Sequence, residues 1–478
     1  MRPSPTLLAL FACFAATSAI AQDTDTEKAV ARDIIARMTT LQQTLNIPAI
    51  VTQLTGPNAA RDAVAARARE LWETELQAMA DDITRHPEVG FTETRSVKIL
   101  TDYLKAHGFT VTDGVAGLKT AWVARYVGTP GGPGLGLIAE YDALRGTKGA
   151  FHGDQHSAQG PVALAAAVAV AEFLAKTKTP GTVIVYGTPA EEMMPPNVKE
   201  VMHDSAVFKE ADVIVRSHSS TSTTRTAPGF GTCCLNINAT KYTFGGAPAH
   251  QMMAWNGRDA LSAAILLFNH IDAIRKNIRP EARIQGILPE GGAAPNVVPD
   301  RAVVDMWVRY PDEPYLEQIS AMVDDAARAA ALATGTKVKI DHYGKARDGI
   351  SQSTLAEVAF AYIKKYGAIK VDPLPGKPQG FEETGTVSRV IPGAEFSAHT
   401  SNGAFHTYEM EADALTEVGH RGFLADAQGM AALLHDFATR PAYRTAVKTE
   451  FDGLKSLYGE YQSLLRSAYA TPKVLDPE

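Results

Sequence analysis

Apolar and polar residues alternate with two different periods along the chain, and the change of period predicts the elements. Residues 25–45 and 60–85 repeat apolar side chains at helical spacing, and Pro48 and the pair Gly56-Pro57 lie between these two predicted helices. Another helix is predicted over residues 96–107. Three helices are therefore predicted between residues 25 and 107.

Short apolar runs rich in β-branched residues follow, separated by helical stretches. Strands are predicted over residues 120–126, 135–140, 183–186 and 213–215, and a very apolar helix over residues 162–174. Strands that alternate with helices are typical of a parallel or mixed sheet covered on both faces. This part of the chain is thus predicted to be an α/β domain.

The pattern changes in the middle of the chain. Strand, helix, strand, strand, helix and strand are predicted there in turn, over residues 234–244, 257–276, 282–288, 302–310, 314–333 and 337–343. This βαββαβ order is the ferredoxin-like arrangement. Helical patterns return at 354–366 and 413–440, so a small unit is predicted to be inserted into the larger domain.

The first 21 residues have the features of a secretory signal peptide. Arg2 supplies a positive start, residues 7–14 are apolar, and Ala19 and Ala21 form a small-x-small cleavage site. The alternative to a cleaved signal peptide is the attachment of a lipid at Cys13. We predict a secreted, periplasmic protein with these boundaries: signal peptide 1–21, larger domain 22–230, inserted domain 231–345 and larger domain again 346–478.

Composition narrows the classes of protein. The 478 residues exceed the roughly 100–200 of one domain, and 45% hydrophobic with 21% charged residues is usual for globular proteins. A net charge of −7 without a basic run argues against nucleic-acid binding, and after the signal no stretch approaches the ~20 apolar residues of a membrane span. Cys233 and Cys234 are predicted to be packed thiols in a strand; a disulfide or a metal role is the alternative.

Side chains that bind metals follow three successive predicted strands. They are Asp142, His152, Asp154 and His156 after the first strand, Glu191 and Glu192 after the second, and His218 after the third. Carboxylates with imidazoles are the ligands expected for zinc, manganese or cobalt, and two adjacent carboxylates could divide metal binding from proton transfer. The competing interpretation is that such histidines are surface or capping residues.

Six short motifs occur along the chain in a fixed order. They are HPEVGF at 86–91, AEYDAL at 139–144, GTPAEE at 187–192, APNVVPDR at 294–301, FHTY at 405–408 and GHRG at 419–422. The motifs and their order resemble the M20 family of metallopeptidases and amidohydrolases, in the branch of aminobenzoyl-glutamate hydrolase and the amino-acid-conjugate hydrolases. The resemblance spans about residues 60–440. It implies a zinc-peptidase-like α/β catalytic domain, with a mixed sheet, and an inserted ferredoxin-like lid through which two subunits dimerise.

The resemblance also implies roles for single residues. Glu192 would bind metal and Glu191 would be the general base, while His218 and His406 would be further metal ligands. From the lid, three residues match positions that reach the substrate: His250, from the neighbouring subunit, and the substrate-binding residues Asn296 and Arg309. His250 would also stabilise the developing oxyanion.

One stretch departs from the family pattern. Where this branch carries Cys-Gly-His, with Cys and His as ligands, the chain has HGDQH at residues 152–156. We favour Asp154 and His156 as the ligands, because Gly160 follows His156 by four residues, as the family glycine follows its histidine. The alternative pairs His152 with the Cys position. Arg145, Thr386 and the MMPP run at 193–196 also depart from the pattern, so substrate specificity should not be copied from relatives.

The sequence thus predicts an enzyme that hydrolyses the amide bond of N-acyl or aryl-acyl amino acids. Two divalent ions (Zn, Mn or Co) would be held by five residues: Asp154, His156, Glu192, His218 and His406. The expected partners are a small amide substrate with a carboxylate and a second copy of the chain. A dipeptidase or carboxypeptidase, or a non-catalytic binding protein with this fold, are the alternatives.

Overall fold

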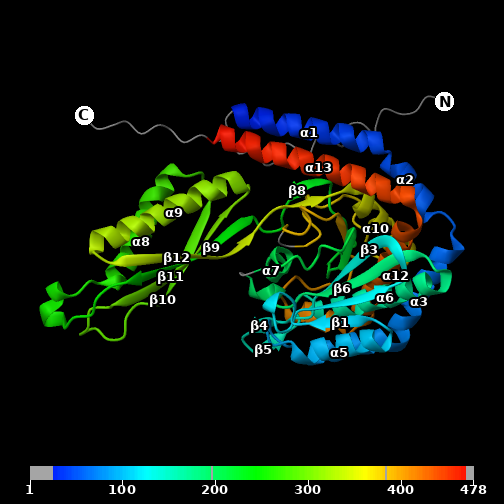
Figure 1. Ribbon diagram of the computed structural model, residues 1–478, viewed down its shortest axis with the longest axis horizontal. Coiled ribbons are helices and arrows are strands. Elements are labelled where there is room, and N and C mark those ends of the chain that lie inside the picture. Colours follow the sequence, from blue (N-terminus) through cyan, green and yellow to red (C-terminus); the bar gives the residue numbers. More distant parts are fainter. Residues whose placement is uncertain (1–24, 195–196, 383–384, 470–478) are drawn as a thin grey trace.

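The computed structural model describes residues 25–194, 197–382 and 385–469. The predicted signal peptide lies outside these residues. A larger α/β domain and a smaller lid are connected by two chain segments (Figure 1). The short strands β8 (Gly229–Gly231) and β13 (Gly349–Ser351) lie in these segments and pair with each other.

The larger domain is built on a six-stranded mixed sheet, in the order β1-β2-β6-β3-β7-β14. These strands are β1 (Thr110–Asp113), β2 (Trp122–Val127), β3 (Thr129–Ala139), β6 (Pro180–Gly187), β7 (Val213–Ser217) and β14 (Gly393–Phe396). The strands β3, β6, β7 and β14 are parallel to one another, whereas β2 is antiparallel to both of its neighbours, β1 and β6. Parallel strands end at the same edge of a sheet, which becomes the usual place for a site.

Helices cover both faces of this sheet. The helices of the larger domain are α1 (Asp25–Leu45), α2 (Ile47–Thr55), α3 (Ala59–Leu71), α4 (Gln77–Arg85), α5 (Thr94–Ala106), α6 (His156–Thr177), α7 (Val198–Asp204), α10 (Ser353–Lys365), α11 (Tyr408–Ala414), α12 (Glu417–Thr439) and α13 (Pro441–Ala468). One large core joins α3, α6, α10 and α12 to one face, and a smaller core with Met202 and Phe208 covers the other.

Helix α6 is apolar on every side. The expectation that no stretch after the signal approaches the length of a membrane span was wrong, because α6, alone among the described helices, is long and apolar enough to cross one. However, 83% of its most apolar window is buried inside the protein. A central helix between a sheet and other helices needs such a surface. Burial in the core therefore accounts for its composition.

The lid has the predicted βαββαβ order. Its elements are β9 (Asn236–Gly245), α8 (Ala260–Ile274), β10 (Arg283–Glu290), β11 (Arg301–Tyr310), α9 (Glu313–Thr334) and β12 (Lys337–Ala346). The four strands form an antiparallel sheet in the order β10-β11-β9-β12, and α8 and α9 share one hydrophobic core with it. The predicted α/β fold class with a ferredoxin-like insertion is confirmed.

The predicted helices over 25–45 and 60–85 are confirmed, the second with a π-helical turn at Trp72–Leu76. The segment between them forms α2, which was not predicted, and Pro48 lies in its first turn, where the missing N–H of proline leaves no hydrogen bond unmade. One strand boundary was wrong, because the first lid strand begins at Asn236, two residues later than predicted.

Helix α13 was not predicted, yet it links the two domains. It lies along α1 on one side of the molecule (Figure 1). Beyond its end, the hydroxyl of Tyr469 donates to Asp312 Oδ2 of the lid at 2.7 Å, and Gln318 Nε2 donates to the Tyr469 carbonyl at 2.9 Å. The C-terminal part of the chain thus contacts the lid as well as the larger domain.

Candidate metal centre

The candidate ligands gather at the carboxyl edge of the parallel strands. Asp142 follows β3, Glu191 and Glu192 follow β6, and His218 follows β7. The loop before α6 supplies Asp154, and α6 itself begins at His156. His406, in the segment before α11, joins them from far along the chain.

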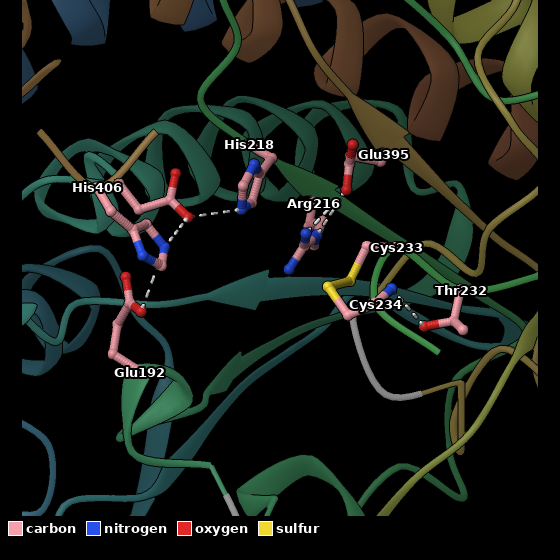
Figure 2. The surroundings of a disulfide bond; sticks show 9 residues. Glu192, Arg216, His218, Thr232, Cys233, Cys234, Glu395 and His406 are labelled. Atoms are coloured by element: carbon pink, nitrogen blue, oxygen red, sulfur yellow. Dashed lines mark hydrogen bonds and ion pairs between the residues drawn. A yellow bond between two sulfur atoms is a disulfide. The ribbon is translucent and has the colours of Figure 1, made fainter. Parts of the chain in front are cut away.

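Asp154 is the centre of this cluster. Its Oδ2 lies 3.6 Å from Nε2 of His218, 3.8 Å from Nε2 of His406 and 4.0 Å from Nε2 of His156. On the other side, His406 Nε2 lies 3.7 Å from a carboxylate oxygen of Glu192, and Figure 2 shows these two side chains turned toward each other. One carboxylate therefore faces three imidazoles.

The potential ligand atoms form three overlapping groups, with the atoms of each group within 4.8 Å of one another. The groups are Asp154 with His156 and His218, Asp154 with Glu192 and His406, and His156 with Glu191 and Glu192. Asp154 belongs to two of them. A carboxylate that belongs to two neighbouring groups could bind two adjacent cations at once.

Asp142 orients the cluster from behind. Its Oδ1 accepts from Nδ1 of His156 at 3.0 Å, and its Oδ2 accepts from the Glu192 backbone N–H at 2.9 Å. Nε2 of His156 is buried and has no hydrogen-bond partner among the described residues. An imidazole with one nitrogen held by a carboxylate and the other free is typical of a metal ligand, so the donor set fits a divalent cation.

Burial and nearby charges shift three pKa values here. Burial opposes protonation of His156, but the Asp142 carboxylate outweighs it and raises the pKa of His156 well above its ordinary value. Burial likewise opposes ionisation of Asp142, but the bond from His156 holds the pKa of Asp142 below its usual range. Burial lowers the pKa of His152 to about 3, so this ring is neutral near pH 7.

His152 is placed differently from His156. It is buried, neither ring nitrogen has a hydrogen-bond partner among the described residues, and it belongs to none of the three ligand groups. Its backbone N–H donates to Glu411 Oε1 at 2.8 Å. The structure thus brings Asp154 and His156, rather than His152, together with the other candidate ligands.

This difference leads to a direct test. We expect His156→Ala to lower the metal content sharply and His152→Ala to leave it near the wild-type value, because only the first change removes a ligand atom. Metal analysis of the purified proteins, with thermal melting to show that both fold, measures the difference. If only the His152→Ala protein lost metal, His152 and not His156 would be the ligand.

The lid residues do not join the cluster within one chain. His250 and Asn296 lie in neighbouring loops, since the N–H of Gln251 donates to the Asn296 carbonyl at 3.0 Å. Both side chains are exposed, and neither belongs to a ligand group. Arg309 lies at the other end of β11, where it pairs with Ile237 beside the link to the larger domain.

The prediction that Cys233 and Cys234 are packed thiols in a strand was wrong. The two residues precede β9 and form a disulfide with each other (Figure 2). The chain passes here from β8 into the lid, so the pair lies in a link between the domains rather than in the sheet. The N–H of Cys234 donates to Thr232 Oγ1 at 3.4 Å.

Sequence reasoning missed two residues that support the cluster. Asp142 was noted after its strand but given no role, although its two bonds orient His156 and Glu192. Ser219, which donates a hydrogen bond to Asp154 Oδ1, was not noticed. Both lie in the loops that follow predicted strands, two residues after the strand end for Asp142 and four for Ser219, and that position was the available signal.

Known proteins show the same organisation. The M20 peptidase dimerisation domain matches residues 236–334. Xaa-Arg dipeptidase of Homo sapiens is 28% identical over 396 residues, which cover 79% of this chain and 88% of that protein. One of the subunits of the p-aminobenzoyl-glutamate hydrolase of Escherichia coli (strain K12) is 32% identical over 306 residues, covering 60% of this chain and 62% of that protein.

A solved structure agrees with these relatives. A dinuclear metal-binding peptidase of the M20 family from Bacillus subtilis superposes with a TM-score of 0.50 and 19% identity, over 77% of this chain and 99% of that one. The dimerisation domain and the two curated relatives indicate a hydrolase lineage, and the solved structure shows the same fold. The chain therefore carries an M20 peptidase dimerisation domain, is homologous to Xaa-Arg dipeptidase and to a subunit of p-aminobenzoyl-glutamate hydrolase, and has structural neighbours in the M20 family.

Proposed function

We propose that this protein is a metal-dependent amidohydrolase that cleaves the amide bond of N-acyl or aryl-acyl amino acids. The observation that carries the proposal is the Asp154 carboxylate, shared between two groups of metal-binding side chains with Glu191 beside them. The relatives named above support hydrolysis of an amide bond as the reaction class. The complete set of donors argues against a binding protein without activity.

Two divalent ions of zinc, manganese or cobalt would be held by five side chains. Asp154 would be shared, with His156, His218, Glu192 and His406 completing the two sites. Such ions, when bound, lower the pKa of water toward neutrality and polarise a carbonyl group. Nitrogen and carboxylate donors suit all three metals.

Glu191 would carry the proton. Its carboxylate oxygen lies 3.9 Å from His156 Nε2, and it belongs to one ligand group, whereas Glu192 belongs to two. A carboxylate at the edge of the cluster can take a proton from the attacking water and return it to the departing nitrogen. Glu192, fixed through its backbone by Asp142, would remain a ligand.

The lid would complete the site from a second copy of the chain. Gly245 pairs with Arg301 and Ile237 pairs with Arg309, so His250 and Arg309 lie at opposite ends of strands about 26 Å long. One lid cannot bring both ends to the same metal centre. We propose a homodimer in which His250 and Asn296 of one protomer and Arg309 of the other meet the substrate, with Arg309 binding its carboxylate.

A mixing experiment tests this arrangement. His250→Ala is expected to lower turnover by roughly 10²–10³-fold while the fold and the metals remain, because it removes one oxyanion donor. Mixed with the Glu191→Gln protein, it should recover up to about a quarter of wild-type activity. Half of randomly exchanged dimers are mixed, and each has one site with both residues intact.

Exchange of protomers must be shown independently, for example by mass spectrometry of differently labelled chains. If exchange occurs and no activity returns, His250 does not act across the interface. If His250→Ala alone is fully active, the histidine only packs at the edge of the lid.

The activity itself is tested by two measurements on purified protein. Metal analysis and release of amino acid from N-acyl and aminobenzoyl amino acids should show hydrolysis that depends on bound metal. Dipeptides ending in arginine should be included, because similarity to Xaa-Arg dipeptidase makes a dipeptidase the second candidate. Bound metal with no hydrolysis of any of these would overturn the proposal.

We also propose that the protein is secreted into the periplasm. The signal-like residues 1–21 support this location, and a disulfide between Cys233 and Cys234 suits an oxidising compartment. Recovery of the mature chain from the periplasmic fraction of the producing cells would test it.

A further inference from the structure

The motif at residues 86–91 lies beside the metal centre but supplies no candidate ligand. Val89 forms a β-bridge with Ala143, and the Ala143 N–H donates to the Glu88 carbonyl at 2.9 Å. The segment thus lies against the loop that carries Asp142. Its continuation, up to the start of α5, reaches the loop that carries Glu191 and Glu192.

Glu93 makes that second contact. Its side chain is fully buried, and its Oε1 accepts from the backbone N–H of Ala190 at 2.8 Å. Ala190 is the residue immediately before Glu191 and has left-handed backbone angles, φ 55° and ψ 35°. A non-glycine residue in this conformation needs support from its surroundings. The hydrogen bond from the Ala190 N–H to Glu93 gives such support at this residue.

The position of Glu93 would ordinarily make it a helix cap. It directly precedes α5, but its side chain makes no capping bond. Glu88 takes that role, since its carboxylate accepts from the N–H groups of Arg95 at 2.9 Å and Ser96 at 2.8 Å. The side chain of Glu93 is therefore directed to the neighbouring loop instead of its own helix.

Gly90 lets the two segments approach closely. A Cβ atom at this residue would lie 2.7 Å from both Cα and Cβ of Ala190 and 2.5 Å from Cγ of Met193. Only glycine fits without moving the loop. The motif and its continuation thus contact residue 190 twice, by a hydrogen bond to Glu93 and by close packing at Gly90.

We infer that Glu93 is a positioning residue: it holds Ala190, and through it the carboxylates of Glu191 and Glu192, in the geometry that the metal centre requires. The expected effect of Glu93 on turnover rests on the function proposed above. The expected effect of Glu93 on the loop that carries Ala190 is independent of that function. Burial raises the pKa of Glu93 to about 7, and both the acid and the carboxylate retain an oxygen that accepts this bond.

Two substitutions at Glu93 separate positioning from general stability. At saturating metal, Glu93→Ala is expected to lower kcat by about 10- to 100-fold with little change in KM, because small displacements of a catalytic group cost this much. Glu93→Gln keeps an acceptor oxygen and should stay within about fivefold of wild type. The inference would be overturned if Glu93→Ala had the same kcat as wild type, or if Glu93→Ala and Glu93→Gln lost kcat to the same extent.

Hydrogen exchange tests the same contact without a substrate. The Ala190 amide should exchange at least about tenfold faster in Glu93→Ala than in wild type or Glu93→Gln, because its acceptor is gone. Unchanged exchange would overturn the inference. If the wild-type protein cleaves no amide but this exchange pattern is found, the proposed function fails and the positioning contact stands.

Three further variants guard against misfolding of Glu93→Ala. Gly90→Ala retains Glu93 but must displace Ala190, so it should also lower kcat, whereas Gly459→Ala in open space on α13 should not. Glu88→Ala removes the α5 cap and should lower the melting temperature without this loss of kcat. A kcat loss in Glu88→Ala as large as in Glu93→Ala would show a merely structural effect and overturn the inference.

Discussion

The Glu191→Gln protein is expected to turn over its amide substrate at least 10²-fold more slowly than wild type and still bind its metals. General acid–base catalysis contributes about 10²–10⁴-fold, and an amide of the same shape cannot carry the proton. The carboxylate lies 3.9 Å from His156 Nε2, close enough to act on a water between the ligands. Steady-state kinetics and metal analysis on one preparation measure both effects.

Glu192→Gln is the matched control. Glu192 belongs to two of the three ligand groups, so its loss should reduce metal content first and activity as a consequence. Excess metal should then restore part of its activity, but not that of Glu191→Gln. If Glu191→Gln loses metal while Glu192→Gln keeps it, the roles of the pair are reversed.

Asp154→Ala is expected to weaken the binding of both metals strongly. Its carboxylate faces His156, His218 and His406 and is shared by two ligand groups, so one substitution weakens both sites. Loss of an outer partner of a ligand already costs 10–100-fold in metal affinity, and a shared ligand should cost at least ~100-fold at each site. Equilibrium dialysis with zinc, followed by metal analysis, measures the two affinities.

Asp154→Cys is the control variant, because a cysteine thiolate keeps a negatively charged metal ligand at this position. A thiolate is a strong zinc ligand and is the side chain that this branch of the family carries there, so this variant should keep more metal than Asp154→Ala. A thermal melt of each apoprotein separates metal loss from unfolding. Retention of both metals by Asp154→Ala would show that Asp154 is not shared between them.

Most of the fold could be predicted because its elements leave local patterns. The βαββαβ order of the lid followed from changes in hydrophobic period, and the strands of the larger domain were short apolar runs. Helix α13 was missed because the predicted helices ended at residue 440, although Pro441 begins this helix. Its buried residues recur every three or four positions, at Tyr443, Val447, Phe451, Leu454 and Tyr458, so the signal was present.

The candidate site could be predicted only in part. The position after a parallel strand located Glu191, Glu192 and His218, since such ends meet at one edge. The choice between His152 and His156 depended on where α6 begins, and helix starts are poorly marked in a sequence. The bonds from Asp142 to His156 and Glu192 join residues up to 50 positions apart, which no local pattern reveals.

By itself, the sequence determined the order and type of most elements, the family motifs and the chemical nature of the candidate ligands, because these depend on neighbouring residues and side-chain chemistry. Only the tertiary structure decided which side chains meet. It placed His406 against Asp154, directed Glu93 to Ala190 and separated His250 from Arg309 by the length of a strand. The physical reason is that these contacts are set by strand pairing and close packing between segments far apart in the chain.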